Sequence, residues 1–274
     1  MRLPAAFLAL ALIASPALAA EPPARPVADS GFSGRAAKAH LTAPQAAGFA
    51  KQIETELATK GARVAIVFRA GRPRDQLPKG ISYTHGAFWV YGDIKGGDGQ
   101  VYQGYSVYNL YQGDGSNLPV DESYLHQDYP FDFVSGAQTD DVSVIIPSPE
   151  MQRRILAVIT SPAYEKLHVK SYTIVSNPLN LAHQNCTEFV LDVVAAAAWQ
   201  SDDPAQITTD LNANFKPTVV HANLLQRLFA PLASPAYNLD DQAGELRTAT
   251  NDSITAFMRD NGLLKDAYVI NRGN

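Results

Sequence analysis

The chain has 274 residues, a formal net charge of −5 and a single cysteine. A mildly acidic chain without a basic cluster or a basic amphipathic helix is not typical of a protein that binds nucleic acid or docks on a membrane surface. One cysteine also excludes an internal disulfide bond.

The first residues have the features of a cleavable signal peptide. Arg2 supplies a positive charge, residues 3–13 are apolar, and residues 17–19 (ALA) have the small-x-small pattern of a cleavage site. The apolar segment is too short to span a bilayer. We therefore predict a signal peptide at 1–19, a periplasmic or secreted protein, and no stable membrane insertion.

The rest of the chain divides by composition into three parts. Residues 20–43 are rich in proline and small side chains, which predicts a linker. Residues 44–200 carry the helix and strand patterns of one domain. Residues 201–274 predict a helical extension packed on that domain, because a segment with so few aromatic residues would form a marginal core alone.

The domain opens with a helix and a buried strand. The helix is predicted from near Pro44 to a stop at Gly61, and the strand is the apolar segment 62–69. Residues 112–141 are dense in Gly, Asp, Pro and Tyr, which predicts a long mobile surface loop that contacts substrate.

A hairpin is predicted between these two regions. Segments 82–91 and 101–111 are rich in aromatic and β-branched residues, and a Gly-Gly-Asp-Gly turn separates them. We expect Tyr91 to pair with about Tyr102, which places His85 opposite residues 108–110.

The second half of the chain predicts further strands and helices. Strands are expected at 142–146 and 170–176, and a helix starts at residues 148–150. Another helix follows Asn185 and runs through residue 198. The C-terminal part predicts helices at 204–212, 218–229 and 253–261 and an edge strand at 267–271.

Cys186 lies at the start of the helix that follows Asn185. Asn185 has the position of an N-cap, and Glu188 has that of a capping-box acid. Backbone N–H groups and the helix dipole favour a thiolate in this first turn, so a nucleophilic cysteine fits here. The alternative is that Cys186 shares the apolar stripe of Val190 and Val193 and is only a small buried side chain.

A nucleophilic thiol requires a base, and six histidines are available. His85 stands out because it lies inside a predicted strand, next to Gly86 and a series of aromatic residues. A satisfied structural histidine is the alternative interpretation. The other histidines are His40, His126, His168, His183 and His221.

The order of two motifs resembles a known family. A strand with Tyr-Thr-His-Gly-Ala-Phe at 83–88 precedes a helix that opens with Asn-Cys-Thr-Glu-Phe-Val at 185–190. This arrangement resembles the circularly permuted branch of the papain-like, NlpC-type cysteine hydrolases over roughly residues 60–200. The chain also looks similar to an exported bacterial family of unknown function.

The resemblance implies roles for three residues. Cys186 would be the nucleophile, His85 the general base and Asn109 the group that orients the imidazole. Gln103 or Tyr108 could replace Asn109, because the third residue varies in such folds. The permuted branch often has a branched apolar side chain two positions after its histidine, where this chain has Ala87, and the superfold also contains acyltransferases and inactive members.

Other kinds of site find less support. No cysteine and histidine cluster has zinc spacing, and the acidic residues of 112–141 lack calcium-loop spacing. We therefore expect no metal and no cofactor.

These observations together predict an α+β protein with a papain-like core, in which an antiparallel sheet packs against the cysteine helix, and a helical C-terminal extension. The expected function is thiol-dependent hydrolysis or acyl transfer at an amide or ester, through an acyl-enzyme on Cys186. The expected partner is a small-molecule or peptide substrate in the cell envelope, with cell-wall peptides as one class. The alternative is a non-catalytic envelope protein that keeps the fold and binds a ligand.

Overall fold

The structure, a computed structural model, describes residues 39–220 and 236–273. The predicted signal peptide, residues 20–38 of the predicted linker and residues 221–229 of a predicted helix lie outside the described residues. The predictions made for these segments stay predictions.

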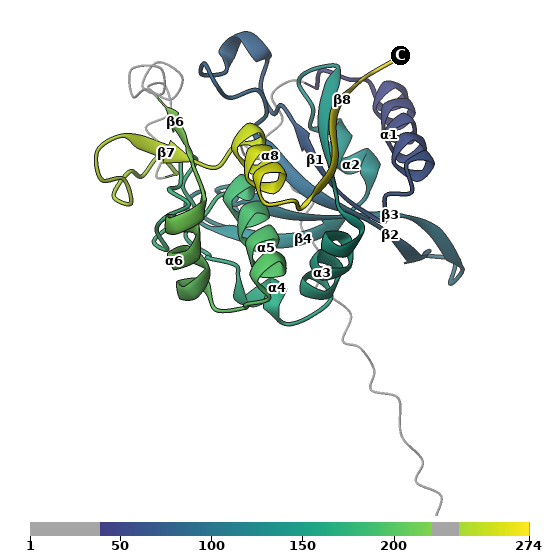
Figure 1. The fold of residues 1–274 in the computed structure, drawn as a ribbon. Helices are drawn as coiled ribbons and strands as arrows, with labels where there is room; N and C mark the ends of the chain where they lie inside the picture. Colours follow the sequence, from purple (N-terminus) through teal and green to yellow (C-terminus); the bar gives the residue numbers. More distant parts are fainter. Residues whose placement is uncertain (1–38, 221–235, 274) are drawn as a thin grey trace, which may run out of the picture.

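A six-stranded sheet runs through the middle of the described structure in the order β4-β3-β2-β1-β5-β8 (Figure 1). Every neighbouring pair is antiparallel. The strands are β1 (Val64–Arg69), β2 (His85–Lys95), β3 (Val101–Gln112), β4 (Ser123–Asp128), β5 (Asp141–Pro147) and β8 (Leu264–Asn271). The central strand β1 is buried along its whole length, as its continuous apolar sequence predicts.

Helices cover both faces of this sheet, which creates two hydrophobic cores. One core lies between the sheet and α3, α5 and α8, and the other lies between the sheet and α1 and α2. The helices are α1 (Ala43–Thr59), α2 (Pro130–Ser135), α3 (Pro149–Ile159), α4 (Ala163–Lys166), α5 (Cys186–Trp199), α6 (Pro204–Asn214) and α8 (Asn251–Asp260). We call the two sides the α5 face and the α1–α2 face.

Local capping explains where several helices begin. The side chain of Thr42 accepts from the backbone N–H of Gln45 at the start of α1, and Ser148 accepts from Met151 at the start of α3. These bonds satisfy backbone donors that lack partners inside the helix. The antiparallel sheet and the helices on both of its faces confirm the predicted antiparallel α+β class.

The prediction of a surface loop at 112–141 is wrong. Residues 123–128 form β4, which pairs with β3 in the sheet, and α2 follows at once. Phe133 of α2 is fully buried in the core of the α1–α2 face. The segment has the composition of a loop because it contains polar side chains such as Asp128. Tertiary contacts bury these side chains, and composition does not reveal such contacts.

Two strand predictions also need correction. Residues 170–176 do not form a strand, since only the isolated bridges at Ser171 and Tyr172 involve them. In the hairpin, Tyr91 pairs with Tyr105 and not with Tyr102, so the register differs by three residues. The first strand continues to Lys95, past its predicted end at residue 91, whereas the second begins at Val101 as predicted.

The C-terminal part is not purely helical. Residues 218–220 form β6, which pairs with β7 (Leu246–Thr248), in place of the predicted helix start. The predicted edge strand at 267–271 is confirmed as part of β8, which pairs with β5 of the central sheet. The extension thus completes the sheet of the preceding domain.

In the part of the chain that the structure describes, no helix is both long and apolar enough to cross a membrane.

Candidate functional site

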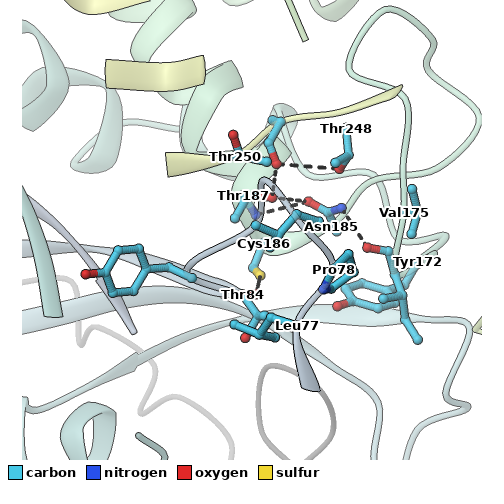
Figure 2. A pocket seen from close by; sticks show the side chains of 14 residues that line it. Leu77, Pro78, Thr84, Tyr172, Val175, Asn185, Cys186, Thr187, Thr248 and Thr250 are labelled. Carbon is cyan, nitrogen blue, oxygen red and sulfur yellow. Dashed lines mark hydrogen bonds between the residues drawn. The ribbon is translucent and has the colours of Figure 1, made fainter. Parts of the chain in front are cut away.

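Cys186 is the first residue of α5, and its surroundings follow from the N-cap. Asn185 Oδ1 accepts from the backbone N–H groups of Thr187 at 3.1 Å and Glu188 at 2.9 Å, as the sequence predicts for an N-cap. Glu188 is buried, and among the described residues no bond to the backbone N–H of Asn185 completes the predicted capping box. The Sγ of Cys186 donates to the carbonyl oxygen of Thr84 at 3.5 Å (Figure 2).

A pocket of about 590 Å³, a volume that includes its open mouth, lies beside this thiol. Figure 2 shows its walls, which come from residues 77–84, 172–175 and 248–250 and from the N-terminus of α5. Its apolar side chains are Leu77, Pro78, Ile81, Ile174, Val175 and Ala249, and its aromatic side chains are Tyr83 and Tyr172. The remaining lining residues are threonines, Asn185 and Cys186, so none of the described lining residues carries a charge at neutral pH.

A buried polar chain starts at His85, the first residue of β2. The Nε2 of His85 lies 3.0 Å from Oδ1 of Asn109 on the neighbouring strand β3. Asn109 Nδ2 donates to Oδ1 of Asp128 on β4 at 2.8 Å, and the hydroxyl of Tyr111 donates to Oδ2 of Asp128 at 2.8 Å. All four side chains are buried.

This chain of hydrogen bonds fixes the tautomer of His85. Because Asn109 Nδ2 donates to Asp128, its Oδ1 is the atom that faces the imidazole, and an amide oxygen only accepts. The Nε2 of His85 therefore carries the hydrogen, and Nδ1 carries the lone pair. Nδ1 is buried and has no hydrogen-bond partner among the described residues.

Aromatic and cationic side chains surround the imidazole. It stacks on Tyr111 with ring centroids 5.2 Å apart and contacts the ring of Phe133 at 5.5 Å. The guanidinium of Arg69 also lies over Phe133, 5.4 Å from its centroid. Burial and the positive charge of Arg69 lower the pKa of His85 well below its usual value, although the bond to Asn109 acts in the opposite direction. His85 is therefore neutral at physiological pH.

The thiol of Cys186 is neutral as well. Burial raises its pKa to about 11, although the N–H of Gly86, the charge of Arg69 and the N–H groups at the start of α5 all act to lower it. The expectation that the helix N-terminus would hold a thiolate is thus wrong for this conformation, because desolvation outweighs the helix dipole.

Cys186 and His85 approach β2 from different sides. Cys186 packs in the core of the α5 face with Phe88, whereas His85 shares the α1–α2 face with Ala87 and Trp89. No hydrogen bond joins the thiol to the imidazole in the described part of the chain. The structure thus brings Asn109 to His85 and leaves Cys186 at the backbone of the residue before His85.

The two alternatives to Asn109 lie away from the imidazole. Gln103 donates to Asp93 in the exposed part of the hairpin. Tyr108 packs against Tyr164 on the α5 face. Asn109 is therefore the one of these three residues whose side chain bonds to His85.

The other described histidines have different neighbours. His40 pairs with Asp140 at 3.3 Å, and the Nε2 of His168 lies 2.9 Å from the hydroxyl of Ser123. His183 bonds to Ser171 and Asp240, and the ring of His126 packs against the rings of Tyr111 and Tyr124. None of these contacts is to Cys186, and His221 lies outside the described residues.

Several residues of the site are not evident from the sequence. Asp128 is 19 residues from Asn109 and lies in a segment that composition assigns to a loop. Arg69 ends an apolar strand, where a charged residue usually marks the exposed strand end. The one sequence signal that could place Asp128 on the same face as Asn109 is the alternation of side chains between the two faces along β4.

Among the described residues, no group of three or more His, Cys, Asp or Glu side chains is arranged to hold a metal ion.

Comparison with protein families gives the class of the chain. A family model described as an uncharacterised protein conserved in bacteria (DUF2145) matches residues 56–258. This match covers well over half of the chain, so the protein belongs to this bacterial family. The predicted similarity to a bacterial family of unknown function is thereby confirmed. Neither curated proteins nor solved structures gave a match.

Proposed function

We propose that the protein is an exported thiol-dependent hydrolase or acyltransferase with a papain-like, NlpC-type core, and that Cys186 carries the acyl group. The observation that carries the proposal is the state of His85. Its Nε2 is fixed by Asn109, and its basic Nδ1 is buried without a partner. An unsatisfied buried nitrogen of this kind calls for an explanation, and a general base is one.

The reaction begins from two neutral groups. As the Sγ of Cys186 attacks the carbonyl carbon of an ester or amide, its proton passes to Nδ1 of His85. The S–C bond forms, the tetrahedral intermediate collapses, and the leaving alcohol or amine takes the proton. Water or a second nucleophile then attacks the thioester and gives its proton to Nδ1, which returns it to the thiol.

The start of α5 supplies electrostatic support for this step. The backbone N–H of Cys186 lies close enough to the sulfur to lower its pKa, and it belongs to the positive end of the helix dipole. Such a donor stabilises the oxyanion that develops on the carbonyl oxygen.

The proton transfer requires the imidazole and the thiol to meet when substrate binds. The ladder between β2 and β3 begins at Phe88 and Tyr108, whereas His85 itself is paired with Arg69 of β1, so bringing the two groups together requires a movement at the start of β2.

A second function is a non-catalytic envelope protein that binds a ligand in the pocket beside Cys186. The specific observation in its favour is the neutral, buried thiol without a hydrogen bond to His85. In this case the hydrogen-bonded chain from His85 to Asp128 serves only to hold β2, β3 and β4 together.

Acyl transfer to Cys186 distinguishes these functions. The purified protein is incubated with p-nitrophenyl acetate, and the acetylated residue is located by peptide mass mapping. We expect an acetyl group on Cys186 in the wild type, and a loss of at least 100-fold in its rate of formation in His85→Ala.

His40→Ala is the matched control, because His40 pairs with the exposed side chain of Asp140, away from the buried chain that starts at His85. This variant should acetylate at the wild-type rate. Equal rates in wild type and His85→Ala, or no acetyl group on Cys186, would contradict the hydrolase and favour the ligand-binding protein.

A further inference from the structure

Several polar side chains that line the pocket beside Cys186 already form hydrogen bonds within the protein. Thr84 accepts from the backbone N–H of Gly71 at 2.8 Å, and Thr187 donates to the carbonyl oxygen of Ala249 at 2.9 Å. Thr250 lies 2.7 Å from the hydroxyl of Thr218. Each of these three threonine hydroxyl groups already forms a hydrogen bond within the protein.

Two larger polar side chains of the lining, Asn185 and Tyr83, are also engaged. Asn185 uses Oδ1 as the cap of α5 and donates from Nδ2 to the carbonyl oxygen of Ile174 at 3.1 Å. Tyr83 donates from its hydroxyl to Asp141 at 2.7 Å. The side chains of Ile81, Ile174 and Val175 complete an apolar surface.

We propose that this pocket binds the acyl part of the substrate, and that this part is an uncharged aliphatic chain. The inference rests on the proposed function, because Cys186 lies among the lining residues and its sulfur is the atom that would be acylated. The lining is predominantly apolar, as is typical of small-molecule sites. Aliphatic carbon gains from burial there, whereas a charged group would lose its hydration without a partner.

This chemistry separates two substrate classes for a thiol hydrolase. A fatty acyl ester or amide presents only methylene groups next to its carbonyl. A cell-wall peptide presents carboxylate or ammonium groups close to the bond that is cleaved, and none of the described lining residues would pair with them. The pocket therefore favours fatty acyl substrates over the cell-wall peptides expected from the sequence.

Two eight-carbon esters test the inference. One is p-nitrophenyl octanoate, and the other is the p-nitrophenyl monoester of octanedioic acid, which has the same length and a terminal carboxylate. In each case the Sγ–C bond forms and p-nitrophenolate leaves. Cys186→Ser provides the background rate.

We expect kcat/KM to be at least 10-fold higher for octanoate than for the charged ester. We also expect octanoate to exceed p-nitrophenyl acetate by at least 10-fold, since burial of each methylene group is worth up to about fourfold in binding. Equal or higher values for the charged ester would overturn the inference while leaving the thiol chemistry intact.

A pair of isoleucine variants locates the effect. Ile81→Glu places a charge in the pocket lining, and Ile94→Glu is the matched control, because Ile94 is a partly buried isoleucine in the distant hairpin. Ile81→Glu should lower kcat/KM for octanoate at least 10-fold, and Ile94→Glu should leave it unchanged. Equal effects of the two variants would contradict the assignment of the pocket.

If no ester reacts, the inference is tested by measuring the binding of unreactive amides. Octanamide and the monoamide of octanedioic acid are titrated into Cys186→Ser by calorimetry. Tighter binding of octanamide, weakened by Ile81→Glu but not by Ile94→Glu, would support the pocket and contradict only the hydrolase. Equal binding of both amides, or binding of neither, would overturn the inference.

Discussion

The two faces of the sheet bury different kinds of functional group on either side of the start of β2. On the α5 face, Cys186 lies beside a pocket whose described walls carry no charge. On the α1–α2 face, His85, Asn109 and Asp128 form a continuous hydrogen-bonded chain with Arg69 nearby. β2 links the faces, because successive side chains of a strand point to opposite sides.

Desolvation explains why the thiol and the imidazole are both neutral. Burial raises the pKa of Cys186 and lowers that of His85, since in each case it disfavours the charged form. The comparison teaches that a helix N-terminus and a nearby cation do not by themselves generate a thiolate. A base must accept the proton during the reaction.

The largest effect is expected in the alkylation of Cys186, which tests whether the thiol on the α5 face is neutral. With a pKa of about 11, the thiol should react with iodoacetamide at pH 7 about 300-fold more slowly than a free cysteine of pKa about 8.5, because only the thiolate reacts. The rate should rise tenfold per pH unit up to that pKa. Mass spectrometry of quenched samples measures it.

Unfolding in urea is the control, since it should restore the rate of a free thiol. Rapid alkylation of the folded protein at pH 7 would show that Cys186 is a thiolate in the free protein.

Asp128 gives the next effect, on stability. Burial raises its pKa to about 7, although the bonds from Tyr111 and Asn109 act to lower it. Between about 3.9, the pKa of an unfolded Asp, and about 7, the native protein binds a proton that the unfolded chain does not. The contribution of Asp128 to stability therefore falls as the pH rises through this window, by up to about 1.4 kcal/mol per pH unit.

Asp128→Asn removes this titration and keeps the shape of the side chain. The free energy of unfolding in urea should fall less between pH 5 and pH 8 in the variant than in the wild type, by up to about 3 kcal/mol. Part of the pH dependence should remain, because burial also raises the pKa values of Glu188 and Asp192 of α5. An unchanged pH dependence would show that Asp128 is ionised in the native state at pH 5.

The sequence reveals the parts of this site that depend on local contacts. The N-cap of α5 is readable because Asn185 bonds to backbone groups two and three residues away. It places Cys186 in the first turn without knowledge of the tertiary fold. The strand character of His85 is readable from its aromatic and β-branched neighbours.

The remaining parts depend on contacts between distant segments. The error of three residues in the hairpin register changes which residues flank His85, and Asn109 reaches it across strands. Asp128 joins the network only because β4 pairs with β3. The desolvation that decides the pKa of Cys186 arises from the whole core and has no local signal.

Asn109 provides a smaller effect on the α1–α2 face. Asn109→Ala removes the acceptor that holds the Nε2 hydrogen of His85, so Nδ1 can become protonated in place of Nε2. We expect kcat for ester hydrolysis to fall 10- to 100-fold, and ¹⁵N NMR of His85 to show a mixture of tautomers. Gln103→Ala, in the exposed hairpin, is the matched control and should change neither measurement.

Loss of activity without a change in the tautomer would mean that Asn109 acts only on packing. An unchanged kcat with mixed tautomers would separate the polar chain from catalysis and leave it as a structural element of the α1–α2 face.

Gly86 gives the smallest effect and tests how closely β2 is packed on the α5 face. A Cβ at this position would lie 2.5 Å from the ring of Phe68, which is fully buried on β1 and cannot move without disturbing the core. Overpacking of this kind costs about 1–3 kcal/mol, so Gly86→Ala should lower the free energy of unfolding by about that amount.

Gly92→Ala is the matched control in the same strand, since a Cβ there meets no atom within 4 Å. Urea unfolding of both variants should show a loss for Gly86→Ala alone. Equal stabilities would mean that β2 or the ring of Phe68 can shift to make room for the added methyl group.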